Sequence, residues 1–544
     1  MPNEPSTILA QIDRATREND LALAAQLAHR ALEEGHLSPD LLRLRAQWRR
    51  QNGQLDGALE DLQQAHALLP NDPAILTAIA EVLNTLGRHR LAITAAGDAL
   101  QVDGAHPTAW FQKAFAHQMV NEFDLARDAY LQAVRCKPDF GEAHARLANL
   151  SVLQGRTDEA RQFADRALAY RPGDAGAMTA LVRADLTDGR LDAAEGRLVA
   201  MLSDSRAPPT LRAGLLSLLG DLRDAQGCID LAFDAYTEAG AIWRSIHEER
   251  FRRSGRETAI DQIVRVTSDI NRLPPGTWRA TGSPAGTDAG KSNGLVFVLG
   301  FPRSGTTLLG QILANRPGIV VLEEKPLLAK AVADLFDPID CVARLAALSG
   351  AEIASYREDF WRRAERHGGD LSSKLVIEQT AFNTAYLPVI LRLFPDAKIV
   401  FALRDPRDVV LSCFRRQFAV NLFTLELNSL ESTALLYDAA LRLAEVCRAL
   451  LGLQTFDIRN EDVIADFDSQ TRRLCEFVGS PWDESMRDFH RGNTDRTLST
   501  VSASQVRRGL SANGVGHWRS YRECLGSVLP VLMPWVERFG YPAN

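Results

Sequence analysis

The stretch LVFVLGFPRSGTTLLGQIL, residues 295–313, decides the fold of the C-terminal half of this 544-residue chain. It opens with the apolar run LVFVL, which is typical of a strand buried on both faces of a parallel sheet. A loop containing Gly300 and Gly305 follows, and the segment after it has a helical pattern. Glycines at such a strand-to-helix turn are typical of a P-loop, where backbone amides and a helix N-terminus bind phosphate-like oxyanions.

This loop lacks the lysine of the common nucleotide-binding motif. That motif reads GxxxxGK[ST], and Thr306 stands in the lysine position. Arg303, inside the loop, can supply positive charge instead. On this loop alone, a modified P-loop kinase stays open as an alternative.

A second apolar run, KIVFAL at residues 398–403, also leads into a loop and a helical pattern. Arg404 begins its loop, and Ser412 follows eight residues later, about one turn into the predicted helix. These two side chains can converge on a second phosphate group. Two strand–loop–helix units in succession predict an α/β domain with a parallel sheet. The pair Arg404 and Ser412, together with Thr306, argues against a kinase.

The first half of the chain is built from a 34-residue repeat. Glycine or asparagine recurs at this interval and alanine follows five positions later. These two columns are Gly53, Gly87, Asn121, Gly155 and Gly189, and Ala58, Ala92, Ala126, Ala160 and Ala194. Glycine permits a left-handed turn between two helices, and alanine allows those helices to pack closely. The repeat predicts an α-solenoid of about seven two-helix units.

These patterns divide the chain into three predicted parts. Residues 1–250 are helical repeats, and residues 251–291 are a connector, first helical and then rich in Pro, Gly, Ser and Thr. Residues 292–544 form the P-loop domain. The predicted fold class is therefore an N-terminal α-solenoid followed by a P-loop α/β domain with a parallel sheet.

Composition excludes several classes of partner. A net charge of −7 argues against nucleic acid, which requires a basic face. The seven cysteines include no CxxC pair, so neither a disulfide framework nor a metal site is predicted. The first residues lack a signal-peptide pattern, and no apolar run approaches the ~18 residues of a membrane span. A cytoplasmic protein is the expectation.

Three motifs in order resemble a known family. The stretches LVFVLGFPRSGTTLLGQIL, KIVFALRDPRDVVLSCFRR and TLSTVSASQVRRGLSANGVGHWRSY are similar to segments of tyrosylprotein sulfotransferases and of sulfotransferases coupled to tetratricopeptide repeats. The N-terminal repeat likewise resembles the tetratricopeptide repeat. The resemblance over residues 292–540 implies transfer of a sulfuryl group from PAPS (3′-phosphoadenylyl sulfate) to a hydroxyl or amine of an acceptor, without a metal.

The resemblance also implies roles for single residues. The phosphosulfate end of PAPS would be bound by Arg303, Ser304, Gly305, Thr306 and Thr307. Arg404, Ser412, Arg507 and Arg508 would bind the 3′-phosphate. Glu324, in VVLEEKP, would be the catalytic base, with Glu323 as the second choice, and Arg303 would be catalytic as well.

Two positions depart from the family pattern. Gln379 stands where relatives carry a lysine near the leaving phosphate, and Asn460 stands where they carry a tyrosine against adenine. These departures keep a second interpretation open, a non-catalytic adaptor with a degenerate PAPS-binding domain. The repeats could bind a protein partner, present the acceptor or mediate self-association, and the sequence does not choose among these.

Overall fold

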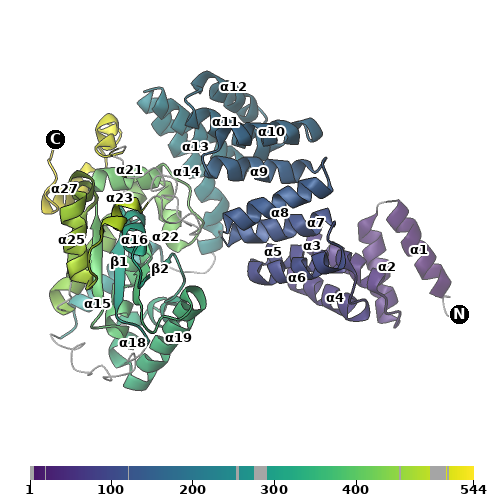
Figure 1. The fold of residues 1–544 in the computed structure, drawn as a ribbon, viewed down its shortest axis with the longest axis horizontal. Helices are drawn as coiled ribbons and strands as arrows, with labels where there is room; N and C mark the ends of the chain where they lie inside the picture. Colours follow the sequence, from purple (N-terminus) through teal and green to yellow (C-terminus); the bar gives the residue numbers. More distant parts are fainter. Residues whose placement is uncertain are drawn as a thin grey trace. The chain divides into compact units, whose positions relative to one another are not determined.

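The computed structural model divides into two compact units, Met1–Gly189 and Arg190–Asn544 (Figure 1). The described residues are 5–18, 20–120, 122–252, 257–274, 291–451, 455–489, 510, 512 and 514–544. The boundaries near residues 250 and 292 follow repeat register and composition rather than contacts, and they stay predictions.

The first unit consists of helices that follow the repeat register. They are α1 (Pro5–Arg17), α2 (Leu21–Glu33), α3 (Pro39–Gln51), α4 (Leu55–Leu68), α5 (Pro73–Thr85), α6 (His89–Val102), α7 (Pro107–Met119), α8 (Phe123–Cys136), α9 (Gly141–Leu153), α10 (Thr157–Tyr170) and α11 (Ala175–Thr187). Gly53, Gly87 and Gly155 adopt φ values of +73° to +74° at the turns. Ala58 and Ala92, five residues after their glycines, are fully buried between helices. The predicted helical solenoid is confirmed.

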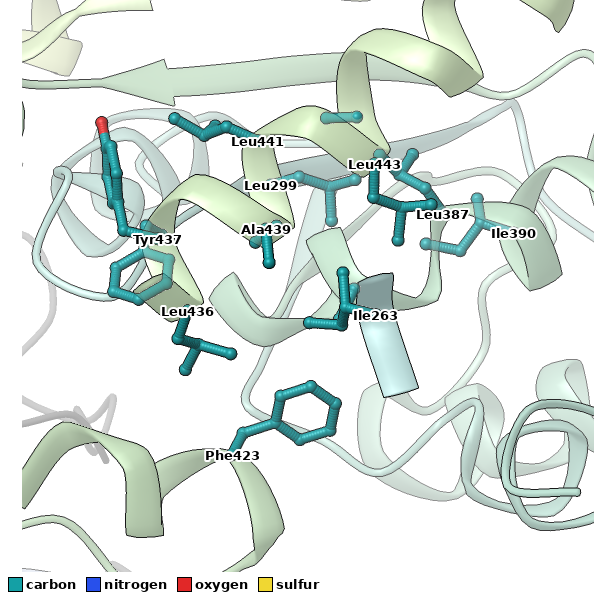
Figure 2. Packing of buried hydrophobic residues seen from close by; sticks show 14 of the residues in the cluster. Ile263, Leu299, Leu387, Ile390, Phe423, Leu436, Tyr437, Ala439, Leu441 and Leu443 are labelled. Carbon is teal, nitrogen blue, oxygen red and sulfur yellow. The ribbon is translucent and has the colours of Figure 1, made fainter. Parts of the chain in front are cut away.

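The second unit begins with further repeat helices, α12 (Leu191–Leu202), α13 (Pro209–Ala225) and α14 (Ile229–Arg252). The next helix, α15 (Ala259–Asn271), falls in the predicted connector. Its apolar stripe packs into the core of the unit, where Ile263 is fully buried. Figure 2 shows Ile263 in one cluster with Leu299 and Leu443. This part of the connector therefore belongs to the core around the sheet.

A five-stranded parallel sheet forms the centre of this unit. Its strands are β1 (Leu295–Gly300), β2 (Ile319–Glu323), β3 (Leu375–Gln379), β4 (Lys398–Leu403) and β5 (Thr455–Arg459), in the order β2-β3-β1-β4-β5. Val298 lies opposite Gln379 of β3 and Val400 of β4. Because all neighbouring strands are parallel, their carboxyl ends meet at one edge. The predicted parallel α/β sheet is confirmed.

Alternate residues of the strands face two helical layers. Val296 and Val298 of β1 pack against α16 (Thr306–Ala314) and α25 (Phe467–Val478), whereas Phe297 and Leu299 pack on the opposite side with α15, α20 (Leu387–Leu393) and α23 (Leu430–Leu451). The remaining segments are α17 (Ala329–Ala331), η1 (Val332–Phe336), α18 (Cys341–Ala347), α19 (Gly350–Gly368), η2 (Ala381–Tyr386), α21 (Pro406–Phe414), α22 (Leu422–Leu425), η3 (Glu426–Asn428), α24 (Asn460–Ala465), η4 (Glu484–Asp488), η5 (His517–Tyr521) and α27 (Leu529–Arg538).

Two further observations concern membranes and metals. None of the helices in the described part of the chain is long and apolar enough to cross a bilayer. Among the same residues, no three His, Cys, Asp or Glu side chains come together as ligands for a metal ion. The cytoplasmic location and the metal-free reaction stay predictions.

Candidate active site

The centre of the sheet contains a topological switch point. The chain leaves β1 toward β2 on one side and leaves β4 toward β5 on the other, while β1 and β4 are hydrogen-bonded neighbours. In open parallel sheets a crevice forms where the connections from adjacent strands diverge in this way, and ligands bind there. The predicted phosphate loop follows β1, and the loop with Arg404 follows β4, so both predicted motifs meet at this point.

The backbone of the phosphate loop requires its glycines. A Cβ placed on Gly300 would lie 2.5 Å from Ser304 Oγ and 2.7 Å from the carbonyl oxygen of Ala402. Gly305 has φ +106°, and a Cβ there would lie 2.8 Å from Asn460 Oδ1. A side chain at either position would push the loop out of place. The glycines therefore permit the close approach that a P-loop needs.

Helix α16 begins directly after this loop. Gly305 is its N-cap and makes no side-chain capping bond, and Thr306 and Thr307, at the first two helical positions, are buried. The amide groups of a first turn without a side-chain cap, together with the helix dipole, favour an anion at this end. Ser304 is also buried, and its hydroxyl donates to the carbonyl of Phe301 at 2.6 Å, which closes the turn.

Arg303 joins the two loops. Its φ of +71° is unusual for a residue with a side chain, and only 9% of the residue is exposed. Its Nε donates to Ser412 Oγ of α21 at 3.0 Å, and Arg404 Nη1 donates to its carbonyl at 3.3 Å. The structure therefore brings Arg303 next to Arg404 and Ser412, and the predicted contacts of these residues with phosphate stay predictions.

A basic cavity of about 220 Å³ lies between these loops. It is lined by four arginines together with other residues of α21 and the C-terminal segment: Arg303, Arg404, Arg415, Arg416, Asp408, Leu411, Ser412, Gly514 and His517. Burial, together with the positive charges of Arg416, Arg404 and Arg415, lowers the pKa of the Arg303 guanidinium to about 10. Like charges that repel one another in this way create a positive potential, which favours binding of an anion.

The outer wall of the cavity is fixed by Asp408. Its carboxylate accepts the amides of Gly516 at 2.6 Å and Trp518 at 2.8 Å, and so holds the C-terminal segment next to α21. Arg407 beside it is fully buried, pairs with Asp405 and lies 3.6 Å from the centre of the Trp518 ring. Arg407 therefore stabilises this wall and does not face the cavity. Arg507 and Arg508 lie outside the described residues, and their predicted contact with phosphate stays a prediction.

Arg415 and Arg416 were not predicted as site residues from the sequence. Both follow α21 and line the cavity, and both are paired with acids of the repeat helix α13. They belong to the quoted motif KIVFALRDPRDVVLSCFRR. Their spacing of three and four residues from Ser412 is the signal that could have placed them on the same face.

A second polar group lies at the ends of β2 and β3. Glu324 follows β2 with φ +49°, and its amide donates to the carbonyl of Gln379 at 2.9 Å. Glu324 is exposed to solvent as a residue, and desolvation of its carboxyl group raises the pKa of that group to about 7 although the Ala381 amide donates to it. Glu323, the other candidate base, is buried. Strand β3 separates β2 from β1, so Glu324 and the basic cavity occupy different parts of one edge.

The neighbour of Glu324 in this group is Glu378, which the sequence analysis also missed. Glu378 is completely buried, and burial together with the negative charge of Glu324 raises its pKa to about 8. Its Oε1 accepts the hydroxyl of Thr380 at 2.6 Å and the amide of Asn383 at 3.0 Å. At neutral pH this carboxyl group is therefore mostly protonated.

Two protein families match this chain, one in the C-terminal domain and one in the helical repeats. Residues 296–484 match the sulfotransferase family, and residues 151–219 match the tetratricopeptide repeat. The C-terminal domain is thus similar to the sulfotransferase family over residues 296–484. The resemblance stated from the sequence is thereby confirmed at the level of these two families.

The relatives that match parts of this chain are distant. An uncharacterized protein of Aquifex aeolicus (strain VF5) is 24% identical over 73% of this chain, which spans 52% of that relative, about half its length. Protein-tyrosine sulfotransferase A of Caenorhabditis elegans is 23% identical over 47% of this chain and 69% of its own length. The protein-tyrosine sulfotransferase of Drosophila melanogaster is 22% identical over 41% of this chain and 46% of its own length.

The two departures from the family pattern have structural consequences in the sulfotransferase domain. Gln379 is fully buried against Gly310 of α16, where a Cβ would collide with the Gln379 amide oxygen. Neither amide atom of Gln379 has a hydrogen-bond partner among the described residues. Asn460 lies against Gly305 and so contacts the phosphate loop. Gln379 is therefore packed under α16, and Asn460 supports the loop.

Proposed function

We propose that the C-terminal domain is a PAPS-dependent sulfotransferase, which transfers a sulfuryl group to a hydroxyl or amine of an acceptor. The observation that carries this proposal is the convergence of Arg303, Arg404, Arg415 and Arg416 on one cavity at the switch point. PAPS supplies the sulfuryl group and bears two separate anionic ends, the 5′-phosphosulfate and the 3′-phosphate. A cavity between two oxyanion-binding loops suits such a molecule.

The described residues fit both ends of PAPS. The loop from Arg303 to Thr307, with the N-terminus of α16, would bind the phosphosulfate, because glycine keeps its backbone accessible. Arg404 and Ser412, with Arg415 and Arg416, would bind the 3′-phosphate. The amide of Gln379 is packed on Gly310, so it does not replace the lysine of relatives. Arg303, inside the phosphate loop, would then supply positive charge to the transferred group.

Glu324 would act as the base toward the acceptor. A pKa of about 7 leaves its carboxyl group substantially ionised at neutral pH and matches it to a proton transfer near that pH. Its exposure lets an acceptor hydroxyl reach it, whereas Glu323 is buried. Glu324 would therefore accept the proton of the attacking hydroxyl, and Arg303 would stabilise negative charge on the sulfuryl group.

The helical repeats would bind a partner or the acceptor. Tetratricopeptide solenoids have extended concave surfaces that bind peptides or proteins. A protein partner, a presented acceptor and a second copy of the chain are all compatible with the repeats of residues 5–245. The acceptor is therefore not specified by this proposal.

Calorimetry with PAP, the desulfated product, against ATP tests the proposal. We expect PAP to bind the full chain more tightly than ATP, and the change Arg404→Ala to weaken PAP binding by about 10- to 100-fold through loss of charge-assisted bonds. Arg442→Ala, an exposed arginine of α23, is the matched control and should leave the affinity unchanged. Binding of ATP without binding of PAP would contradict the proposal and favour a kinase.

A further inference from the structure

The last turn of α13 carries two aspartates that contact the arginines of the basic cavity. Asp224 Oδ2 lies 2.6 Å from Arg415 Nη2, and Asp221 Oδ2 lies 2.8 Å from Arg416 Nη1. The two acids are three residues apart, so they lie on one face of α13. Both arginines also line the cavity. A helix of the repeat register therefore forms the support of the anion site.

Asp224 also holds the C-terminal segment. Its Oδ1 accepts the hydroxyl of Tyr521 at 2.6 Å and contacts His517 Nε2 at 3.1 Å. Burial opposes ionisation, but hydrogen bonds from His517 and Tyr521 and the charge of Arg415 outweigh it and hold the pKa of Asp224 well below its usual range. One ionised carboxylate thus joins α13, the end of α21 and η5.

Aromatic rings fix Arg415 from two further sides. Its guanidinium lies 5.1 Å from the centre of the Tyr236 ring and 5.5 Å from that of Tyr521. The Tyr236 hydroxyl donates to Asp221 at 2.9 Å, so the ring itself is tied to the acidic pair. Arg415 is only 12% exposed at its side chain. Its position is therefore set by α13 and α14 as much as by its own helix.

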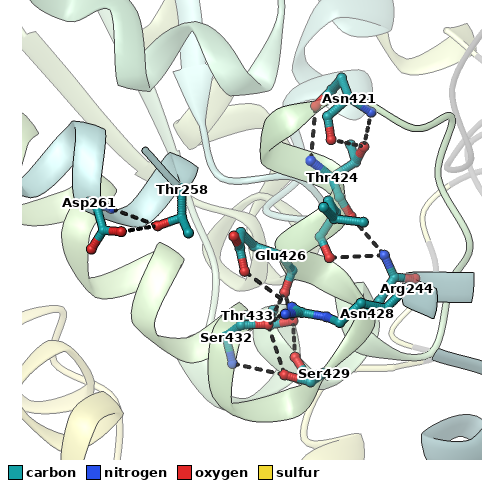
Figure 3. A network of polar contacts seen from close by, with 11 residues as sticks. Arg244, Thr258, Asp261, Asn421, Thr424, Glu426, Asn428, Ser429, Ser432 and Thr433 are labelled. Atoms are coloured by element: carbon teal, nitrogen blue, oxygen red, sulfur yellow. Dashed lines mark hydrogen bonds and ion pairs between the residues drawn. The ribbon is translucent and has the colours of Figure 1, made fainter. Parts of the chain in front are cut away.

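Helices α13 and α14 pack together as a hairpin, and this hairpin has a second contact with the domain that does not involve the aspartates. Arg244 of α14 donates to Ser432 at 2.9 Å and to Glu426 at 3.2 Å (Figure 3). The backbone of α14 touches the domain at Gly240, where a Cβ would collide with the carbonyl of Asn428. Loss of one carboxylate from α13 would therefore change the cavity without releasing the hairpin.

We propose that Asp221 and Asp224 are positioning residues of the anion site, which hold Arg415, Arg416 and His517 toward the ligand. The identity of that ligand as PAPS rests on the proposed function. The two carboxylates neutralise Arg415 and Arg416, but beside the cavity they would by themselves oppose an anion. The pair would nevertheless favour binding because it holds the arginines in place, so that less side-chain freedom is lost when an anion binds.

The proposal links the repeats to the sulfotransferase site. If PAPS binds more tightly when α13 contacts Arg415 and Arg416, then bound PAPS stabilises these contacts by the same free energy.

PAP calorimetry on the full chain separates positioning from charge. We expect Asp224→Asn to weaken PAP binding about 10-fold although it removes a negative charge, and Asp224→Glu to recover part of the loss. Asp230→Asn, an exposed acid of α14 outside the cavity, is the matched control. Equal or tighter binding by Asp224→Asn would overturn the proposal. Failure of the wild-type chain to bind PAP would instead contradict the proposed function.

If Asp224→Asn does not fold, two other measurements test the positioning role of the aspartates. Tyr521→Phe removes one hydrogen bond to Asp224 and should weaken PAP binding about 3-fold. In the wild-type chain, PAP should slow hydrogen exchange of the amides at 221–225 and 514–518, but not in α25. A lower melting temperature with unchanged PAP affinity, or exchange at 221–225 that PAP does not alter, would show that the acids serve folding alone.

Discussion

The two halves of the carboxyl edge of the sheet carry opposite chemistry. After β1 and β4, guanidinium groups gather around a cavity, and acids of α13 pair with two of them. At the ends of β2 and β3, Glu324 and Glu378 are carboxyl groups with raised pKa, and the hydrogen-bond partners of Glu378 are the uncharged Thr380 and Asn383. The first half is suited to binding an anion, and the second is suited to holding and transferring a proton.

The difference arises because guanidinium and carboxyl groups respond differently to desolvation. A guanidinium stays charged even when desolvated, so Arg415 requires partners such as Asp224. A carboxyl group can lose its charge instead, and Glu378 does so because burial raises its pKa to about 8. One edge of one sheet can therefore bind an anion and keep a base beside it, provided that a strand separates them.

The largest expected effect is on the base. Glu324→Gln should reduce turnover about 10³-fold, the range of a general base, while PAP affinity changes less than about 2-fold. The measure is acceptor-dependent release of PAP from PAPS across a panel of acceptors. Glu323→Gln is the comparison variant and should retain most of the turnover. The reverse result for these two variants would identify Glu323 as the base. If the wild-type chain released no PAP with any acceptor, the interpretation as a non-catalytic adaptor would be favoured.

The same base determines the pH dependence of turnover. Glu324 must be ionised to accept a proton, so kcat/KM should fall about 10-fold for each pH unit below a pKa of about 7. Because Glu324 loses this proton as pH rises, the limb must lie on the acid side of the profile. A profile flat from pH 5 to pH 8 would contradict this assignment.

The next effect is on stability, through Glu378. Its pKa in the folded chain is about 8, above its value of 4.5 in a model peptide, so its contribution is complete below pH 4.5 and is lost as pH rises toward 8. Glu378→Gln keeps an oxygen for Thr380 and Asn383 and removes this loss. The variant should gain stability relative to the wild type as pH rises, on the order of 3 kcal/mol by pH 8.

Urea unfolding of both chains at pH 5, 6.5 and 8 measures this change. Glu358→Gln, an exposed glutamate of α19, is the control and should follow the wild type at every pH. If the difference between Glu378→Gln and the wild type were constant over this range, Glu378 would not be buried in its protonated form. The second half of the edge would then not differ from the first in the way described.

The sequence predicted those parts of the molecule that depend on local patterns. Ala58 and Ala92 could be assigned to helix contacts because close packing repeats at a fixed interval in the chain. The phosphate loop could be assigned because Gly300 and Gly305 are required within one strand-to-helix turn. Such features need no knowledge of distant segments, which is why fold class and the first loop followed from the residues.

The missed residues depend on distant segments. The role of Arg415 appears only when α13 is folded beside α21, since Asp224 is far away in the chain. The raised pKa of Glu378 arises from burial at the centre of the sheet and has no local motif. Gln379 could be aligned with a lysine, but only the contact with Gly310 shows where its amide lies. Roles of single residues in catalysis stay predictions.

The smallest expected effect is at the junction of the two loops. Ser412 Oγ accepts Arg303 Nε, so Ser412→Ala removes one hydrogen bond to a buried guanidinium and should weaken PAP binding about 3- to 10-fold. Ser245→Ala, an exposed serine of α14, is the control in calorimetry. The acid limb set by Glu324 should stay in place in Ser412→Ala, because β3 lies between β2, which Glu324 follows, and β1. A shift of that limb together with the affinity would show that the arginines and the carboxyl groups titrate as one system, and the comparison of two separate halves would fail.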